Sequence, residues 1–440
     1  MRTRKIPVAC IQTRAHDRDA FSAAWPRIVA LVDEAAARGA KLIVLPEATV
    51  PGYVLGSAAV PDEQLRSASA DVCRIARTHG TTIVYGSAKN AGGTTLNAAL
   101  VVGPEGAEIG FAAKQFLWHF DRRWFAPGAS LEPVETPLGR LGLLVCADGR
   151  IPTIAATLVE RGAELLVMPT AWVTSGRDPG ALENVQADLM INVRARENGV
   201  PFVAANKSGV ELESVAYCGK SALVDASGRT VARAGERSEE ILLGELEIGV
   251  RPPAARPPFP AAASAGVSAQ RARIAFSNVT DGERLQRLRT LAAQADADVL
   301  LAPGAGTERA IEVAGIRALA TGFERLSAPR GLVEARLAGI DLFVVDAADA
   351  DADWLVAFAR TRAAELRAYV VAFGKGERAF AVDPDGTVVA GTFDGYRTAA
   401  FVYDSARSGA TQVAPQTDVL TGLRTAEALR AQTQPNASLV

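Results

Sequence analysis

Short apolar runs alternate with longer segments of helical periodicity along the first half of the chain. These runs are too short for helices and are typical of buried strands; they occupy residues 42–45, 82–86, 141–145, 164–168 and 202–206. Residues 21–38 instead carry apolar side chains at helical spacing, and Gly39 follows them where a helix commonly ends. The alternation predicts an α/β fold in which helices cover the faces of the sheets.

Composition and charge narrow the class of protein. The 440 residues are 49% hydrophobic, which is enough for a large core and for more than one domain. The net charge of −2 comes from interspersed acids and bases, so we expect no nucleic-acid partner. No apolar stretch approaches the length of a membrane span, and the apolar part of residues 1–13 is too short for a signal peptide. We therefore expect a cytoplasmic protein with no membrane partner.

The cysteines and histidines do not suggest a metal site or a disulfide framework. The four cysteines lie far apart without a C-x-x-C pair, and only three histidines are available as ligands. We expect no metal and no cofactor, and a reducing compartment suits a reactive thiol.

Three segments each carry one reactive side chain, in the order carboxylate, amine, thiol. Glu47 and Cys146 follow apolar runs, and Lys114 lies within residues 111–128. Taken singly, they have ordinary explanations as an acid at the rim of a sheet, a surface lysine and a small core cysteine. Together they are the groups that acyl transfer needs. A thiol attacks the carbon, a carboxylate moves the proton and a cation stabilises the oxyanion.

These segments resemble the nitrilase superfamily of carbon-nitrogen hydrolases over about the first 250 residues. The resemblance implies an αββα sandwich with a Glu-Lys-Cys triad. Glu47 would be the general base and acid, Lys114 the cation beside the tetrahedral intermediate, and Cys146 the nucleophile. The backbone N–H of Ala147 would be a second oxyanion donor.

One position departs from the family pattern. Asp121 stands where many members of the superfamily have a glutamate, before a closely matching W-F-x-P-G segment. Either Asp121 orients Lys114 or the substrate amide, or it is a surface acid neutralised by Arg122 and Arg123.

The residues that follow the cysteine bear on the substrate. Residues 146–152 resemble the corresponding runs of aliphatic amidases and of N-carbamoyl amino acid hydrolases, and they lack the Trp-Glu that usually follows the cysteine in nitrile hydrolysers. The resemblance implies that Arg150 binds a substrate carboxylate, although a structural role is equally open. Thr153 replaces a glutamate often found after the proline. Trp118 and Trp172 are candidate walls of the pocket.

We therefore predict an amidohydrolase that acts on a small amide or N-carbamoyl substrate. It would form a thioester or carbamoyl-enzyme intermediate and release ammonia or an amine. The departures at Asp121 and Thr153 keep a second interpretation open, a binding or scaffolding protein that has lost turnover. An acyltransferase that passes the acyl group to an amine is a third.

The second half of the chain repeats the order of predicted elements. A Pro/Ala-rich segment at 251–270 is expected to be a linker. After it, four segments parallel the first half: residues 272–306 parallel 5–49, 337–348 parallel 161–172, 361–376 parallel 193–209, and 380–391 parallel 221–233. We predict a tandem duplication of one hydrolase fold, with a catalytic domain at 1–250, a second nitrilase-like domain at 271–405 and a tail at 406–440. An unrelated α/β domain is the alternative.

The predicted second copy lacks the reactive side chains. Gly304 stands where the first half has Glu47, and the position of the cysteine falls at residues 322–323. The only lysine of the second half, Lys375, aligns with Lys207. Because two such units pair in the resembled family, we expect the second half to act as a built-in partner in an internal pseudo-dimer. Higher assembly through other surfaces stays open.

Overall fold

The computed structural model describes residues 3–56, 60, 62–174, 180–249, 270–304, 309–376, 378–392 and 397–432. It divides into two compact units: unit 1 comprises residues 1–254 with 425–440, and unit 2 comprises residues 255–424. Except for Gln270, the predicted linker at 251–270 lies outside the described residues. The segment 406–440, predicted as a tail, contains α10 (Val419–Ala431) and contributes to both units.

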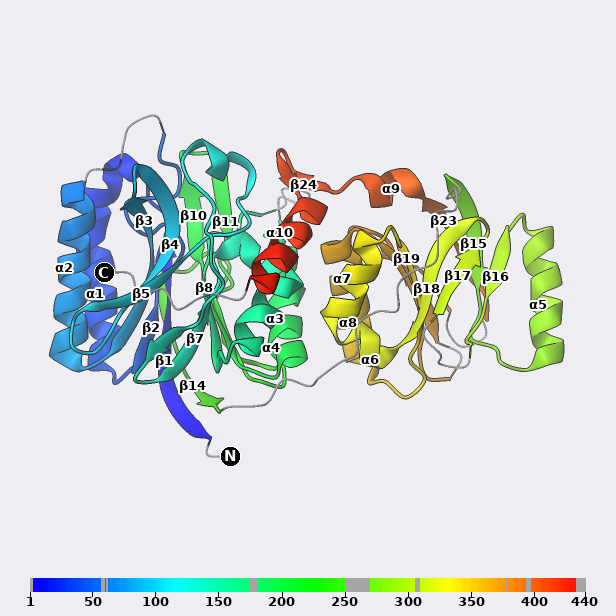
Figure 1. Cartoon of the computed structure of the whole chain (residues 1–440). Coiled ribbons are helices and arrows are strands. Elements are labelled where there is room, and N and C mark those ends of the chain that lie inside the picture. Colours follow the sequence, from blue (N-terminus) through cyan, green and yellow to red (C-terminus); the bar gives the residue numbers. More distant parts are fainter. Residues whose placement is uncertain are drawn as a thin grey trace. The chain divides into compact units, whose positions relative to one another are not determined.

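Unit 1 consists of two sheets with helices on both outer faces, as expected for the first half of the chain (Figure 1). The first sheet has the order β11-β10-β1-β2-β3-β4-β5, and β14 also pairs with β1. Its strands are β1 (Arg4–Arg14), β2 (Leu42–Val44), β3 (Thr82–Ala91), β4 (Thr94–Val102), β5 (Glu108–Ala113), β10 (Lys207–Glu211), β11 (Val215–Cys218) and β14 (Glu240–Ile248).

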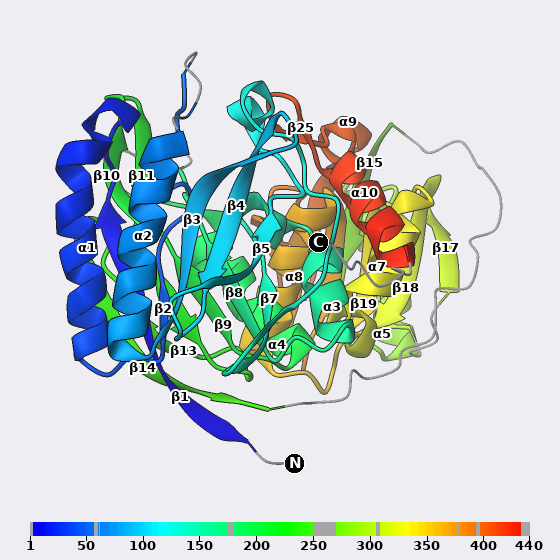
Figure 2. The same cartoon turned by 60° about the vertical axis from the view of Figure 1, so that its left-hand side comes forward.

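The second sheet of unit 1 has the order β13-β12-β9-β8-β7-β6. Its strands are β6 (Val134–Thr136), β7 (Gly139–Leu143), β8 (Leu165–Pro169), β9 (Phe202–Ala205), β12 (Ala222–Val224) and β13 (Thr230–Arg233). Helices α1 (Phe21–Ala37) and α2 (Asp62–His79) lie on the outer face of the first sheet. Helices α3 (Pro152–Glu160) and α4 (Ile191–Asn198) lie on the outer face of the second sheet (Figure 2).

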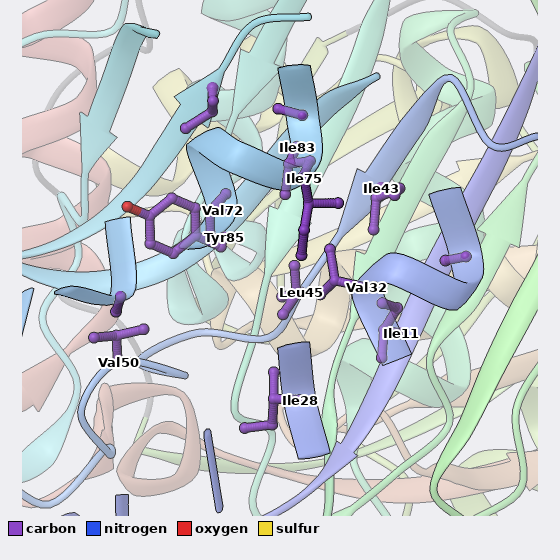
Figure 3. Close-up of a cluster of buried hydrophobic side chains, with 14 of the residues drawn as sticks. Ile11, Ile28, Val32, Ile43, Leu45, Val50, Val72, Ile75, Ile83 and Tyr85 are labelled. Carbon is purple, nitrogen blue, oxygen red and sulfur yellow. The ribbon is translucent and has the colours of Figure 1, made fainter. Parts of the chain in front are cut away.

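Helices α1 and α2 are held on the first sheet by one apolar face each. The side chains at helical spacing on α1 meet those of α2 and of the central strands in one buried cluster (Figure 3). It includes Ile28 and Val32 of α1, Val72 and Ile75 of α2, Ile43 of β2 and Ile83 of β3. Fully burying each such side chain stabilises the fold by about 1.5–3 kcal/mol. This cluster fixes β2 and β3, the strands next to the loop that carries Glu47.

Unit 2 has a three-stranded sheet, β16-β15-β23, and a six-stranded sheet, β17-β18-β19-β20-β21-β22. The strands are β15 (Arg271–Phe276), β16 (Val299–Leu301), β17 (Arg309–Val313), β18 (Ile316–Gly322), β19 (Leu342–Asp346), β20 (Tyr369–Phe373), β21 (Ala379–Val382), β22 (Val388–Gly391) and β23 (Ala399–Asp404). Its helices are α5 (Gly282–Gln294), α6 (Phe323–Leu326), α7 (Pro329–Leu337), α8 (Ala352–Leu366) and α9 (Ser405–Gly409), and β24 (Gln412–Ala414) pairs with β25 (Thr417–Asp418).

The six-stranded sheets of the two units share one pairing pattern. Each has two parallel pairs in the centre, β7-β8-β9 in unit 1 and β18-β19-β20 in unit 2, flanked by antiparallel pairs. The last hairpin of each sheet also has a register shift, between Leu223 and Val224 in unit 1 and between Ala381 and Val382 in unit 2. Only residues 302–308 separate β16 from β17, whereas unit 1 has α2, β3, β4, β5 and Lys114 between β2 and β6.

Gly86 of β3 lies directly against the Glu47 loop. Its N–H donates to the Pro46 carbonyl (3.1 Å), and its own carbonyl accepts from the Val50 N–H (3.2 Å). A Cβ atom at Gly86 would come within 2.4 Å of the Pro46 oxygen and 2.5 Å of the Glu47 Cα. Only glycine permits this approach of two backbones.

We therefore expect Gly86→Ala to displace the Glu47 loop. The substitution should lower the free energy of unfolding by roughly 1–3 kcal/mol, as overpacking does, and should reduce turnover more than this loss of stability explains. Gly282→Ala is the matched control, because a Cβ there meets no atom within 4 Å. Chemical denaturation and steady-state kinetics measure both effects. Wild-type values for Gly86→Ala would show that the loop tolerates the shift.

Candidate active site

Glu47 lies in the loop that follows β2, where the buried strand ends at the rim of the sheet. Its side chain is completely buried. One carboxylate oxygen, Oε1, accepts from the ammonium of Lys114 and from the amide of Asn97, each at 2.7 Å. The other oxygen, Oε2, has no hydrogen-bond partner among the described residues. The carboxylate is therefore held by one oxygen while the second stays available.

Lys114 follows β5 and lies between two buried carboxylates. Its Nζ is 2.7 Å from Glu47 Oε1 and 2.6 Å from Asp121 Oδ2, and all three side chains are fully buried. Burial alone would lower the pKa of Lys114, but the charges of Asp121 and Glu47 raise this pKa well above its usual value. Lys114 is thus a permanent cation in the core of unit 1.

Asp121 lies in the short 3-10 helix His119–Arg123, and its side chain points into the core. Besides Lys114, it accepts from the Tyr53 hydroxyl (2.9 Å) and from the Trp118 N–H (2.9 Å). Arg122 and Arg123 are exposed. Burial and the charge of Asp121 raise the pKa of Tyr53 well above its usual value, so the hydroxyl stays protonated and donates.

Cys146 begins the tight turn Cys146–Arg150, shortly after β7 ends at Leu143. Its backbone has φ +49°, in the left-handed region that costs a residue with a Cβ about 1–2 kcal/mol. The side chain is buried. Burial raises the pKa of the thiol, the charge of Glu47 raises it further, and Lys114 opposes both. The three reactive groups therefore lie within electrostatic range of one another, and the balance keeps Cys146 a thiol at neutral pH.

Asp148 connects the cysteine turn to the lysine segment, a role that its position in the sequence does not indicate. Its Oδ2 accepts from the Val145 N–H (3.0 Å), and its Oδ1 accepts from the N–H groups of Gln115 (3.0 Å) and Phe116 (2.8 Å). Burial raises the pKa of Asp148 to about 7, and the N–H groups that it binds oppose this rise. One carboxylate thus fixes the turn of Cys146 relative to the residues directly after Lys114.

The other predicted residues lie around the same turn. Ala147 is the second residue of the turn and is buried. Arg150 is partly exposed, and its guanidinium carbon lies 5.5 Å from the ring centroid of Trp118, which is also partly exposed. Trp172 is buried. Its backbone N–H donates to Asn206 Oδ1 (2.7 Å), whereas its indole nitrogen Nε1 has no partner among the described residues. The structure brings Arg150 and Trp118 together, and it holds Trp172 in the core.

A second buried network lies behind the Glu47 loop. Lys207 donates to the Ala48 carbonyl (3.1 Å) and lies 3.6 Å from Glu211 Oε2. Glu211 in turn accepts from the N–H groups of Tyr53 (3.0 Å) and Val54 (2.7 Å) and from the Tyr217 hydroxyl (2.7 Å). Lys207 and Glu211 are four residues apart on β10, so their side chains lie on the same face of the strand, but the sequence alone did not predict that this face is buried.

The described part of the chain contains no group of three or more His, Cys, Asp or Glu side chains able to hold a metal ion. None of its helices is long and apolar enough to cross a membrane.

Comparison with known proteins identifies the family. Residues 7–256 match the carbon-nitrogen hydrolase family, so the chain belongs to it. A nitrilase of Pyrococcus abyssi is 29% identical over 227 residues, which cover 50% of this chain and 81% of that protein. An N-carbamoylputrescine amidase of Arabidopsis thaliana is 25% identical over 266 residues, covering 56% of this chain and 88% of that protein.

Solved structures agree with this assignment. An amidase from Nesterenkonia sp. matches with a TM-score of 0.50 and 26% identity over 55% of this chain and 90% of its own. The predicted superfamily and the nitrilase-like fold of the first half are confirmed. So is the predicted class of activity, hydrolysis of a carbon-nitrogen bond through an active-site cysteine.

Proposed function

We propose that unit 1 hydrolyses a small amide or N-carbamoyl compound with Glu47, Lys114 and Cys146 as its catalytic triad. The observation that carries this proposal is the buried contact of Lys114 with Glu47 at 2.7 Å, next to a buried thiol. A cation, a carboxylate with a free oxygen and a nucleophile converge there, as acyl transfer requires. We also propose that the protein works in the cytoplasm, where a reducing environment keeps its free cysteines reduced.

In the first step the sulfur of Cys146 bonds to the carbonyl carbon. Because burial keeps Cys146 protonated, attack requires a base, and Oε2 of Glu47 takes the thiol proton. The ammonium of Lys114 and the N–H of Ala147 stabilise the negative oxygen of the tetrahedral intermediate. Asp121 orients Lys114 toward that oxygen through its 2.6 Å contact.

In the second step the carbon-nitrogen bond breaks. Glu47 returns its proton to the leaving nitrogen, which departs as ammonia or an amine and leaves an acyl group on Cys146. Glu47 then removes a proton from water, the hydroxide attacks the thioester, and the sulfur leaves and is reprotonated. Transfer to an amine in place of water would make the protein an acyltransferase.

The triad predicts distinct results for three substitutions. Cys146→Ala should abolish turnover and keep the fold, because it removes only a buried sulfur. Lys114→Ala should abolish turnover and also lower stability, since two buried carboxylates would face each other without a cation. Asp121→Asn should be milder, raising the barrier by about 1–3 kcal/mol, because the amide oxygen can still accept from Lys114 and the Trp118 N–H while the amide NH2 donates to the Tyr53 oxygen.

Ammonia release from a panel of amides and carbamoyl amino acids measures these effects, and mass spectrometry after brief exposure to each compound detects the acyl adduct. The adduct should be absent in Cys146→Ala and present in Lys114→Ala only at trace level. Turnover within tenfold of wild type in either variant would rule the triad out. Absence of any adduct in the wild type would instead favour a binding protein.

For the substrate, we propose a compound with a carboxylate near the scissile group. Arg150 supports this, since its guanidinium stacks near Trp118 at a partly exposed position beside the Cys146 turn. A guanidinium binds a carboxylate through two parallel hydrogen bonds, which lysine cannot reproduce.

Accordingly, Arg150→Lys should raise KM for acidic substrates by roughly tenfold or more and leave neutral amides nearly unchanged. Kinetics on matched pairs, such as an acidic amide and its methyl ester, separate the two cases. Equal losses for both members of a pair would assign Arg150 a structural role.

We further propose that unit 2 is a degenerate second copy of the hydrolase fold that serves as a built-in partner. The common strand pairing and the equivalent register shifts support a common origin. So do two equivalent ion pairs: Arg194 binds Glu197 and the Gly149 carbonyl, and Arg362 binds Glu365 and the Leu326 carbonyl. In this proposal Phe323 corresponds to Cys146. Cys146 begins the turn that precedes α3, which starts at Pro152, and Phe323 begins the turn that precedes α7, which starts at Pro329.

The built-in partner predicts a change of assembly when unit 2 is removed. In one variant a Gly/Ser linker replaces residues 255–424, so that all of unit 1 is retained. It should aggregate or self-associate, because the pairing face would be exposed, whereas the intact chain should be active without a second copy. Sedimentation velocity with activity measured on each fraction tests this. A monomeric, fully active variant would show that unit 2 is not a partner.

A further inference from the structure

The last turns of α10 lie along α3, the helix that follows the cysteine turn. Thr153, in the first turn of α3, donates to Glu427 Oε1 at 2.9 Å. Arg430 of α10 binds the other oxygen of Glu427 through Nε (2.9 Å) and Nη2 (2.7 Å). The Glu427 carboxylate is thus held between two partners and lies at the start of α3, where the helix dipole favours a negative charge.

The other end of α3 contacts the same segment. Arg161, which directly follows α3, donates from Nη2 to the carbonyls of Leu429 (3.3 Å), Arg430 (3.3 Å) and Gln432 (3.0 Å). These carbonyls belong to the end of α10, whose dipole favours a cation. The two ends of α3 are therefore each fastened to residues 425–432 by a charged side chain.

Helix α3 is continuous with the turn that carries the nucleophile. The turn Cys146–Arg150 leads through the buried Ile151, whose N–H donates to the Asp148 carbonyl (3.0 Å), into Pro152 and Thr153. A shift of α3 would therefore move Cys146 relative to Glu47, and a misplacement of about 1 Å can cost on the order of a hundredfold in rate.

We propose that residues 425–432 form a C-terminal latch in which Glu427 is a positioning residue for the Cys146 turn. A residue that follows all of unit 2 in the chain thereby supports the geometry of the site in unit 1. The inference rests on the proposed function of Cys146 as nucleophile, but it can be tested without turnover.

The test uses the full-length chain and three changes at the latch. Glu427→Ala and Thr153→Val each remove one partner of the hydrogen bond, and the second is close to isosteric. Glu427→Gln keeps an oxygen that can accept from Thr153. Glu160→Ala is the control, because Glu160 is an exposed carboxylate on the same helix.

Three quantities are measured: kcat and KM on an accepted amide, the rate of Cys146 alkylation by iodoacetamide followed by peptide mass spectrometry, and Tm. Glu427→Ala and Thr153→Val should each lower kcat about tenfold with KM within about twofold, and slow the alkylation about threefold or more. The double variant should lose no more than either single one, because both remove one interaction. Glu427→Gln should recover most of the loss.

The proposal would be wrong if Glu427→Ala kept the wild-type kcat and its alkylation were unchanged or faster. A lower Tm would then mean that Glu427 only stabilises the fold. If the wild type turns over no amide, the proposed function fails while the alkylation rates still decide the latch. If the wild type is active and the latch variants match it, the latch fails and the proposed function stands.

Discussion

Unit 1 has to bury the ion cluster of Lys114, Glu47 and Asp121 with every charge placed next to its partners. Removing three charges from water costs several kcal/mol for each ion, and this cost is offset only when all partners are placed accurately. The two carboxylates outnumber the one ammonium, so the cluster also needs neutral donors, which Asn97, Tyr53 and the Trp118 N–H provide.

The groups of this cluster come from the loop after β2, the strand β4, the end of β5 and a 3-10 helix, and only a packed sheet brings such segments together. Burial raises the pKa of the neighbouring Cys146 thiol and the charge of Glu47 raises it further, while Lys114 opposes both.

Two kinds of buried ion pair can be distinguished by comparing the units. The Arg194–Glu197 pair and the Arg362–Glu365 pair each hold a helix and donate to a carbonyl of the turn below it. Because this arrangement also occurs in unit 2, where Phe323 and not a cysteine begins the turn below the helix, it does not depend on a cysteine and its role is structural. The described residues of unit 2 contain no cluster like that of Lys114, and the residues between β16 and β17, 302–308, are too few to hold a strand like β5. In this protein a buried ion pair that occurs in both units is therefore structural. Only the Lys114 cluster, which needs the segment around β5, points to catalysis.

Local pattern was sufficient for the elements, whereas Glu47, Lys114 and Cys146 were singled out only by their order along the chain and by the segments that flank them. The helix predicted at 21–38 is observed as Phe21–Ala37, and the run at 202–206 as β9, because apolar periodicity is a property of neighbouring residues. Side-chain partners were not predictable in this way. Asn97 lies in an ordinary strand and Asp148 in a turn, and each gains its role from a residue far away in the chain. The same holds for Thr153. In the sequence it is only a departure from a family pattern, whereas in the structure its hydroxyl meets a carboxylate from the other end of the chain.

The backbone of Cys146 shows why so many of these distant contacts converge on one turn. A left-handed conformation at a residue with a Cβ persists only when its surroundings leave no alternative. Asp148 fixes the turn to Gln115 and Phe116, and Arg194 fixes the Gly149 carbonyl, so that two independent segments hold it from different sides. Neither contact touches the sulfur. The strain at Cys146 is thus maintained by hydrogen bonds to the flanking backbone, while the thiol itself lies near Glu47, Lys114 and Thr170.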